Sequence, residues 1–235
     1  VIVGYSTMHP VDGSEYDLLY VVKTDSKGNY IWSKIVGDTE NWYRAYSIST
    51  GNDGGYIIVA EAYDVVNNSD KAYILKIDEL GNTEWSKTYS GNFNPKVIRK
   101  TMDGSYIIAD SNLKIMKIDN AGNEIWNKDI NDEIDNGSLT HYMRSFVETS
   151  DGGIAIVTEG PERSDGNGAG SDAYLIKIDT NGSLLWWKYF GANDNGNGFN
   201  DLRETRDKGF IIVGQDNGWT TGGFWLLKTD LNGEL

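Results

Sequence analysis

The segment Tyr174-Leu-Ile-Lys-Ile-Asp-Thr-Asn-Gly-Ser-Leu-Leu-Trp186 carries a pattern that recurs along this 235-residue chain and indicates its fold. Its centre, Lys-x-Asp-x-x-Gly, occurs five times, and the aspartates of successive copies lie 41 to 60 residues apart. In four copies a tryptophan and then a lysine follow the glycine. The copies begin at Lys23, Lys76, Lys117, Lys177 and Lys228. A repeat of this length indicates a fold built from similar units along the chain.

A second motif precedes the first within each unit. Asp-Gly-Gly followed by an apolar run occurs at Asp53 and Asp151, with weaker copies at Asp103 and Asp207. Asp-Gly is a strong signal for a β-hairpin, because glycine adopts positive φ without strain. The opening segment Val1-Ile2-Val3-Gly4 matches the apolar run of the last unit, but without its turn.

Each unit therefore predicts four antiparallel strands, and such units are typical of β-propeller blades. We predict an all-β propeller of five four-stranded repeats, forming a single domain over residues 1–235. The first unit lacks its first strand and the fifth lacks nearly all of its fourth. Two interpretations therefore stay open. The chain is either a five-bladed ring with an imperfect seam or five blades of a larger ring. The predicted repeats span residues 1–38, 39–91, 92–131, 132–191 and 192–235.

These motifs resemble the β-propeller repeats of secreted and surface proteins of archaea and bacteria. Those repeats carry Ser-x-x-x-Thr-x-Asp-Gly-Gly-Tyr-Ile and then Tyr-Leu-Ile-Lys-x-Asp-x-x-Gly-Asn-x-x-Trp. The fourth unit matches closely, over Ser145–Gly153 and Tyr174–Trp186. The Asp-x-x-Gly-x-x-x-Trp part is also similar, more distantly, to pyrroloquinoline-quinone-type propeller repeats. The resemblance covers nearly the whole chain and implies the fold, whereas propellers serve many functions.

The composition excludes several kinds of site. The chain has no cysteine and two histidines, so disulfides, thiolate sites and a three-histidine metal site are excluded. A net charge of −14 argues against a surface that binds nucleic acid. The mean hydropathy of −0.47 and the lack of a long apolar run argue against insertion into a membrane.

The recurring residues are expected to be structural. Trp85 and its equivalents would wedge neighbouring blades together, and Asp78 and its equivalents would cap tight turns. Lys76, two positions before Asp78, and Lys87 on the neighbouring strand are expected to form solvated cross-strand pairs of small energetic weight. The equivalent tryptophans are Trp32, Trp126 and Trp186.

The candidate ligand-binding residues are aromatic side chains in the polar, unequal loops of one propeller face. Unequal loops on a regular scaffold commonly carry function. An aromatic ring stacks on the apolar face of a sugar, and neighbouring Asp and Asn bond its hydroxyls. The alternative is that these rings fold back over the tops of the blades. The candidates are Trp42, Tyr63, Phe93, Tyr142 and Trp219, with Trp219 as the best single platform.

Calcium is the one metal that the sequence leaves as a candidate, and no other cofactor is expected. Asp165, Asn167 and Asp194 offer hard oxygen ligands in glycine-rich loops. Neither loop satisfies the EF-hand spacing, since Ala169 and Gly196 fall on ligand positions. Plain solvated turns are the alternative.

The sequence thus predicts a secreted or surface-displayed module that recognises a glycan or a surface protein without catalysis. A surface-layer or scaffold propeller is the first alternative. A glycoside hydrolase or lyase is the second, and the hydrolase would require two carboxylates about 5–10 Å apart at the channel mouth. No Ser-His-Asp arrangement is recognisable around His9 or His141.

Overall fold

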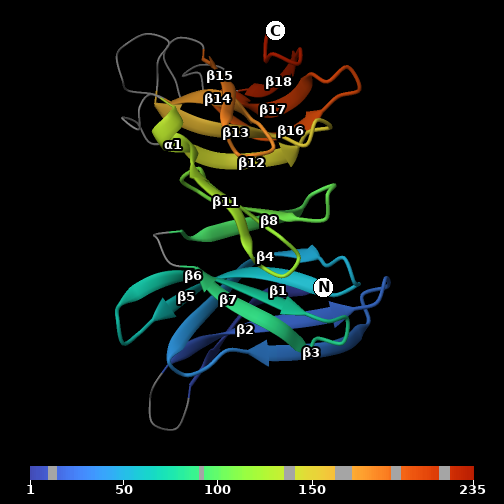
Figure 1. The fold of residues 1–235 in the computed structure, drawn as a ribbon, viewed down its shortest axis with the longest axis vertical. Helices are drawn as coiled ribbons and strands as arrows, with labels where there is room; N and C mark the ends of the chain where they lie inside the picture. Colours follow the sequence, from blue (N-terminus) through green and yellow to red (C-terminus); the bar gives the residue numbers. More distant parts are fainter. Residues whose placement is uncertain (10–14, 90–92, 135–140, 162–170, 192–196, 217–222) are drawn as a thin grey trace. The chain divides into compact units, whose positions relative to one another are not determined.

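The computed structural model of the chain describes residues 1–9, 15–89, 93–134, 141–161, 171–191, 197–216 and 223–235. These residues form eighteen β-strands and one four-residue helix, α1 (Ile130–Glu133), so the all-β prediction is confirmed (Figure 1). The strands form five antiparallel sheets in chain order, with three or four strands each, in a propeller-like fold. Within the described residues, no helix is long and apolar enough to cross a membrane.

The five sheets follow one another along the sequence. Sheet 1 contains β1 (Ile2–Met8), β2 (Tyr16–Thr24) and β3 (Tyr30–Val36). Sheet 2 contains β4 (Asn41–Thr50), β5 (Tyr56–Asp64), β6 (Ser69–Ile77) and β7 (Thr83–Tyr89). Sheet 3 contains β8 (Pro95–Lys100), β9 (Tyr106–Asp110), β10 (Lys114–Ile118) and β11 (Glu124–Asp129). Sheet 4 contains β12 (Tyr142–Glu148), β13 (Ile154–Pro161), β14 (Ser171–Ile178) and β15 (Leu184–Phe190). Sheet 5 contains β16 (Asn197–Glu204), β17 (Phe210–Asp216) and β18 (Gly223–Thr229).

The strand counts match the repeat pattern. Sheets 1 and 5 have three strands and sheets 2 to 4 have four, as the missing first and last strands predicted. In every sheet, strands that are neighbours in the sequence are also neighbours in space. Each predicted repeat encloses the strands of one sheet.

The chain divides into two compact units. Unit 1 comprises residues 1–110 and 116–125, and unit 2 comprises residues 111–115 and 126–235. The division runs through sheet 3. The prediction of a single domain stays a prediction, and each unit is described by itself below.

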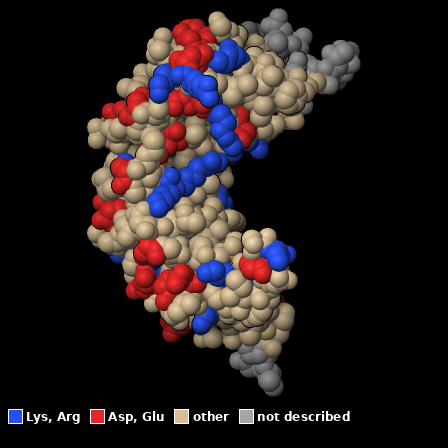
Figure 2. Space-filling model, turned by 90° about the vertical axis from the view of Figure 1, so that its right-hand side faces the viewer, with Lys and Arg blue, Asp and Glu red and all other residues tan. Residues whose placement is uncertain are grey.

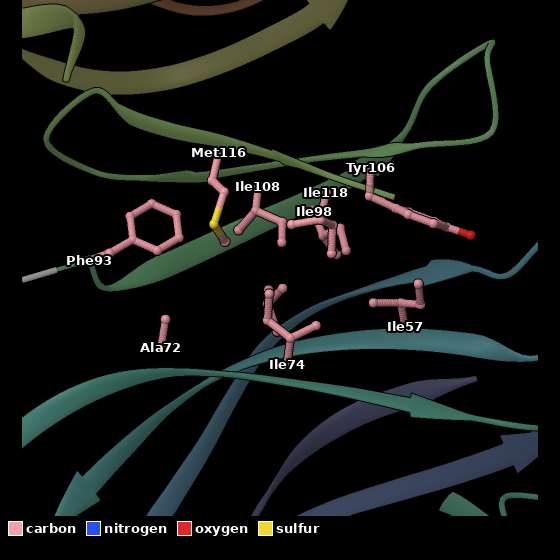
Figure 3. Packing of buried hydrophobic residues seen from close by; sticks show 10 residues of the cluster. Ile57, Ala72, Ile74, Phe93, Ile98, Tyr106, Ile108, Met116 and Ile118 are labelled. Atoms are coloured by element: carbon pink, nitrogen blue, oxygen red, sulfur yellow. The ribbon is translucent and has the colours of Figure 1, made fainter. Parts of the chain in front are cut away.

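The core of unit 1 lies between successive sheets. Ile74 of sheet 2 points towards Ile108 and Met116 of sheet 3, and Ile57 lies below Tyr106, in one buried cluster (Figure 3). A second cluster joins sheet 1 to sheet 2, and a third joins sheets 4 and 5 of unit 2. The apolar runs after each Asp-Gly turn supply these contacts, because both faces of those strands are covered.

The aspartate of each turn between third and fourth strands caps that turn, as predicted. Oδ1 of Asp78 accepts hydrogen bonds from the backbone N of Leu80 at 2.9 Å and of Asn82 at 2.8 Å. Gly81 then adopts a φ of +82°, a conformation that favours glycine. The same bonds recur at Asp25, Asp119, Asp179 and Asp230.

The recurring tryptophans pack against the turn of the following sheet, so their predicted wedge role is confirmed. A Cβ atom added at Gly122 would lie 2.7 Å from Cη2 of Trp85. Nε1 of Trp126 also donates a hydrogen bond to the Thr180 carbonyl at 3.0 Å. The other contacts join Trp32 to Gly81, Trp126 to Gly182 and Trp186 to Gly233.

The expectation of a solvated pair was wrong for Lys76. The Lys76 side chain is only 1% exposed, and its Nζ lies 2.6 Å from Glu84 Oε2. Its other partner, Asp53, belongs to the Asp-Gly-Gly turn of the same sheet. Lys87 instead donates to the side chain of Asn123 in the next sheet, at 2.9 Å.

Charged side chains of both signs lie on the surface. Figure 2 shows acidic groups at several places on one face, with basic side chains among them. On that face the excess of acidic residues is therefore spread out rather than gathered at one place.

Candidate functional site

The structure brings two of the predicted aromatic residues together. Trp42 on β4 and Tyr63 on β5 are direct cross-strand partners, with ring centroids 5.5 Å apart at an interplanar angle of 39°. The sequence placed both in loops, but β4 begins at Asn41 and β5 continues to Asp64. The pair is therefore held by a strand ladder, which fixes ring positions better than a loop does.

The other predicted residues lie elsewhere. Phe93 is 5% exposed and belongs to the buried cluster between sheets 2 and 3, so its prediction as a ligand platform is corrected to a core residue. Its ring is apolar, and the neighbouring sheet offers it an apolar surface. Tyr142 begins β12 of unit 2 and is 52% exposed.

Four predicted residues cannot be placed in the site. Trp219, Asp165, Asn167 and Asp194 lie outside the described residues. Within the described ranges, no group of three or more His, Asp or Glu side chains could hold a metal ion. The calcium prediction therefore stays a prediction.

Trp42 and Tyr63 border a cavity of about 280 Å³ in unit 1. Side chains of a strand alternate between its faces, so Arg44 shares the face of Trp42 and Glu61 shares that of Tyr63. The ladder sets Arg44 opposite Glu61, and Tyr63 opposite Asp70 of β6. These five residues line the cavity, which combines two aromatic rings with two carboxyl groups and one guanidinium.

Glu61 is the polar centre of this cavity. Its Oε2 accepts a hydrogen bond from the Tyr46 hydroxyl at 2.6 Å, and its Oε1 accepts one from Asn94 Nδ2 at 3.0 Å. Lys96 Nζ lies 3.8 Å from Oε2. Burial and the bond to Glu61 raise the pKa of Tyr46 to about 12, so its hydroxyl stays a donor at neutral pH.

Two β-bulges aim residues at Glu61. The ladder between β4 and β5 shifts register between Ala45 and Ser47, which leaves Tyr46 as the extra residue. The ladder between β8 and β9 shifts in the same way at Lys96. Lys96 Nζ lies 3.5 Å from the centre of the Tyr46 ring, a cation–π contact. Bulges re-aim side chains in this manner, and nothing in the sequence marks them.

Asp70 and Glu61 form a carboxyl pair. Burial, then the charge of Glu61 and a hydrogen bond between the two side chains, raise the pKa of Asp70. Two carboxylates in contact repel each other, so the pair favours a proton or a positively charged group beside it.

Arg44 is held in place by a neighbouring strand. Its Nε donates to Oδ2 of Asp17 at 2.8 Å, and the Thr7 hydroxyl donates to Oδ1 of the same carboxylate at 2.7 Å. Burial raises the pKa of Asp17, but these two bonds outweigh burial and leave the pKa below its usual value. Asp17 therefore remains charged, and it already compensates the charge of Arg44.

Unit 2 contains a related arrangement without the aromatic pair. Arg144 occupies the bulge of β12 and pairs with Glu159 of β13, which also accepts from Ser171 at 2.8 Å. Pro161 stands two residues after Glu159, whereas Tyr63 stands two residues after Glu61. The acid and the bulge thus recur with the fold, and the paired rings distinguish the cavity of unit 1.

Comparisons with known proteins bear on the fold alone. No protein-family model and no curated protein matches the chain. A protein of unknown function from Bacteroides caccae aligns over 93% of this chain and 75% of that chain, at 12% identity and a TM-score of 0.55. A catalytically inactive virginiamycin B lyase from Staphylococcus aureus aligns over 97% and 84%, at 10% identity and a TM-score of 0.42. The Dos1 propeller aligns over 89% and 65%, at 11% identity and a TM-score of 0.36.

Proposed function

We propose that this chain is a non-catalytic recognition module that binds a carbohydrate in the Trp42–Tyr63 cavity. The observation that carries the proposal is a pair of ladder-held aromatic rings beside the carboxyl groups of Glu61 and Asp70. The rings would stack on the apolar face of a sugar, and the carboxylates would accept its hydroxyl hydrogens. Secretion or display at a cell surface is part of this proposal, and so is a glycan-bearing partner.

The charges of the cavity select the kind of sugar. Arg44 is compensated by Asp17, and Lys96 offsets one charge of the Glu61–Asp70 pair, so one negative charge is left over in the lining. A uronic acid would place a third carboxylate beside them, which is unfavourable. Neutral sugars and amino sugars fit, because an ammonium group would relieve the repulsion between the two acids.

Catalysis has less support from this geometry. A glycoside hydrolase keeps its two carboxyl groups about 5–10 Å apart to leave room for the sugar bond or water. In the Trp42–Tyr63 cavity burial and the charge of Glu61 raise the pKa of Asp70, and the charge of Lys96 lowers it. Glu61 also accepts bonds from Tyr46 and Asn94, which suits a fixed acceptor rather than a group that exchanges protons.

The experiment is a glycan-array screen followed by calorimetry, each with calcium and with a chelator. We expect Trp42→Ala and Tyr63→Ala to weaken binding about tenfold or more, equivalent to about 1.4 kcal/mol. Tyr142→Ala is the matched control, since it removes an exposed aromatic ring from unit 2. Absence of binding to any glycan in both buffers would overturn the proposal. Glycan binding that is lost only in the presence of the chelator would implicate a bound metal.

A scaffold role is the second candidate, and one observation favours it. Phe224 and Leu226 lie on one face of β18 and are 77% and 55% exposed. Exposed apolar side chains of this kind mark packing surfaces. Self-association that disappears in Phe224→Ser/Leu226→Ser would support it, measured by sedimentation velocity. If the unmodified chain stays monomeric at every concentration, the scaffold role is wrong.

A further inference from the structure

A second cavity adjoins the first in unit 1. It has a volume of about 210 Å³. Trp42 and Arg44 line it, and the same two residues line the Trp42–Tyr63 cavity. The remaining lining residues come from or precede β1 and β2 of sheet 1. They are Tyr5, Thr7, Glu15, Tyr16 and Asp17.

The ladder of sheet 1 builds the new part of this cavity. Thr7 is the partner of Asp17, and Met8 is the partner of Tyr16. Tyr5 and Thr7 are two residues apart, so both side chains lie on the same face of β1. The cavity therefore has a wall of fixed strand residues on the side of sheet 1.

Arg44 joins the two cavities. Its guanidinium carbon lies 5.5 Å from the centre of the Tyr5 ring, and its Nε is bonded to Asp17. On its own sheet Arg44 is the ladder partner of Glu61. The hydrogen bond to Asp17 raises the pKa of Arg44, so the residue stays charged and anchored. Trp42 and Arg44 thus line both cavities, and Arg44 is fixed in position there.

The second cavity offers groups that bond hydroxyls. Both oxygens of Asp17 are used within the protein, so the other polar residues of the lining are Tyr5, Tyr16 and Glu15. The Glu15 side chain is 67% exposed, and its contact at 3.2 Å is with His9, which is equally exposed. A surface contact of this kind is easily exchanged for a ligand.

We propose that the two cavities are adjoining subsites for an oligosaccharide of at least two sugar units. One unit lies on the Trp42–Tyr63 pair beside Glu61, and the next lies across Trp42 among Tyr5, Glu15 and Tyr16. This inference rests on the carbohydrate proposal and extends it to the class of ligand. The module then recognises a stretch of glycan chain, and a single terminal sugar fills only half of the site.

The test uses the β-1,4-linked glucosamine series from one to four units, titrated into the intact chain by calorimetry. The matching N-acetylglucosamine and galacturonate series serve as neutral and anionic comparisons. We expect affinity to rise about fivefold to tenfold from one unit to two, and little from three to four. The galacturonate series should bind at least tenfold more weakly than the glucosamine series at equal length.

Variants assign the length dependence to the second cavity. Glu15→Gln and Tyr16→Phe remove bonding groups while keeping size and shape. Combined, they should abolish the gain from one unit to two and leave the single unit unaffected. Tyr63→Ala should weaken every member of the series equally. Glu15→Gln alone changes an exposed side chain, so it reports on binding even if Tyr16→Phe alters stability.

The outcomes separate the two proposals. If no member of the three series and no array glycan binds, the carbohydrate proposal fails and this inference fails with it. If glycans bind with affinities that do not depend on length, the carbohydrate proposal stands and the inference is wrong. The inference is also wrong if the gain with length survives the combined Glu15 and Tyr16 variant.

Discussion

Lys76 Nζ lies 2.7 Å from Oδ2 of Asp53, and this bond ties the third strand of sheet 2 to the turn between its first two strands. The two residues belong to the two recurring motifs of the sequence. Burial lowers the pKa of Lys76, but hydrogen bonds to Asp53 and Glu84 outweigh burial and raise it. The same clasp recurs as Lys117–Asp103, Lys177–Asp151 and Lys228–Asp207, at 2.7, 3.1 and 2.9 Å.

The first prediction concerns this clasp. The double variant Asp53→Asn/Glu84→Gln leaves the buried Lys76 cation without a counter-charge, and we expect it to lose about 3 kcal/mol of unfolding free energy. Asp207→Asn is the control, because the Lys228 side chain is 45% exposed and water replaces the partner. That loss should stay below about 1 kcal/mol. Urea unfolding followed by circular dichroism measures both. Equal losses would contradict a role for burial.

The second prediction separates backbone strain from packing at two equivalent turns. Gly28 and Gly122 have φ values of +85° and +73°, but only Gly122 faces a tryptophan. Gly28→Ala should therefore cost about 1–2 kcal/mol through strain alone. Gly122→Ala should cost more, because its Cβ would meet Trp85 at 2.7 Å. Adding Trp85→Leu to Gly122→Ala should recover part of that difference. The urea midpoints of Gly28→Ala, Gly122→Ala and the double variant would show it. Equal costs at both glycines would contradict the wedge.

The third prediction is a loss of stability in acid through Asp151. Burial raises its pKa, but bonds from Thr149, Gly153 and Lys177 outweigh burial and lower the pKa from 3.8 to about 2. A carboxyl with a lowered pKa stabilises the fold above its unfolded pKa and loses that effect as pH falls. Unfolding free energy should therefore drop between pH 4 and pH 2. In Asp151→Asn the drop should be smaller, and an unchanged pH profile would refute the assignment.

The fourth prediction concerns buried His141 in unit 2. Its side chain is fully buried against Tyr174, and its Nε2 has no hydrogen-bond partner within the described part of the chain. Burial lowers its pKa below 6.5, so the unfolded chain binds a proton that the folded chain excludes. Unfolding free energy should fall as pH drops from 7 to 5.

The control for His141 is the other histidine. His141→Asn should flatten the pH profile between 7 and 5, although the variant is less stable at every pH. His9→Gln replaces a side chain that is 65% exposed and shows whether the effect is specific to His141. A flat profile in the unmodified chain would count against the prediction.

The fifth prediction links stability and binding at the candidate site. Asp70→Asn removes the repulsion with Glu61, so the unfolding free energy should rise by a few tenths of a kcal/mol, as is common when a binding group is neutralised. Binding of glucosamine oligomers should weaken, because one of two acceptors for the ammonium group is lost. Thermal unfolding and calorimetry on the same sample measure both effects. Destabilisation without a change in binding would show that Asp70 only supports the fold.

Part of the candidate site could be predicted from the sequence. Trp42 and Tyr63 were recognised as aromatic residues in polar surroundings, and the structure pairs them. Phe93 satisfied the same criterion and is a core residue, because a sequence pattern does not say which neighbour covers a ring. Glu61, Asp70, Tyr46 and Lys96 were missed, since none of them belongs to the Asp-Gly-Gly or the Lys-x-Asp-x-x-Gly motif.

The repeating architecture of this protein follows from local sequence patterns. Asp-Gly turns, apolar runs and the tryptophan before lysine act over a few residues, so each unit specifies its own strands and its contact with the next turn. The candidate site, in contrast, forms only when separate sheets pack together. Tyr46 on β4, Lys96 on β8 and Asn94 just before β8 reach Glu61, and Asp17 reaches Arg44 from sheet 1. Such contacts depend on bulges and on the packing of separate sheets, and no local pattern in the chain encodes either.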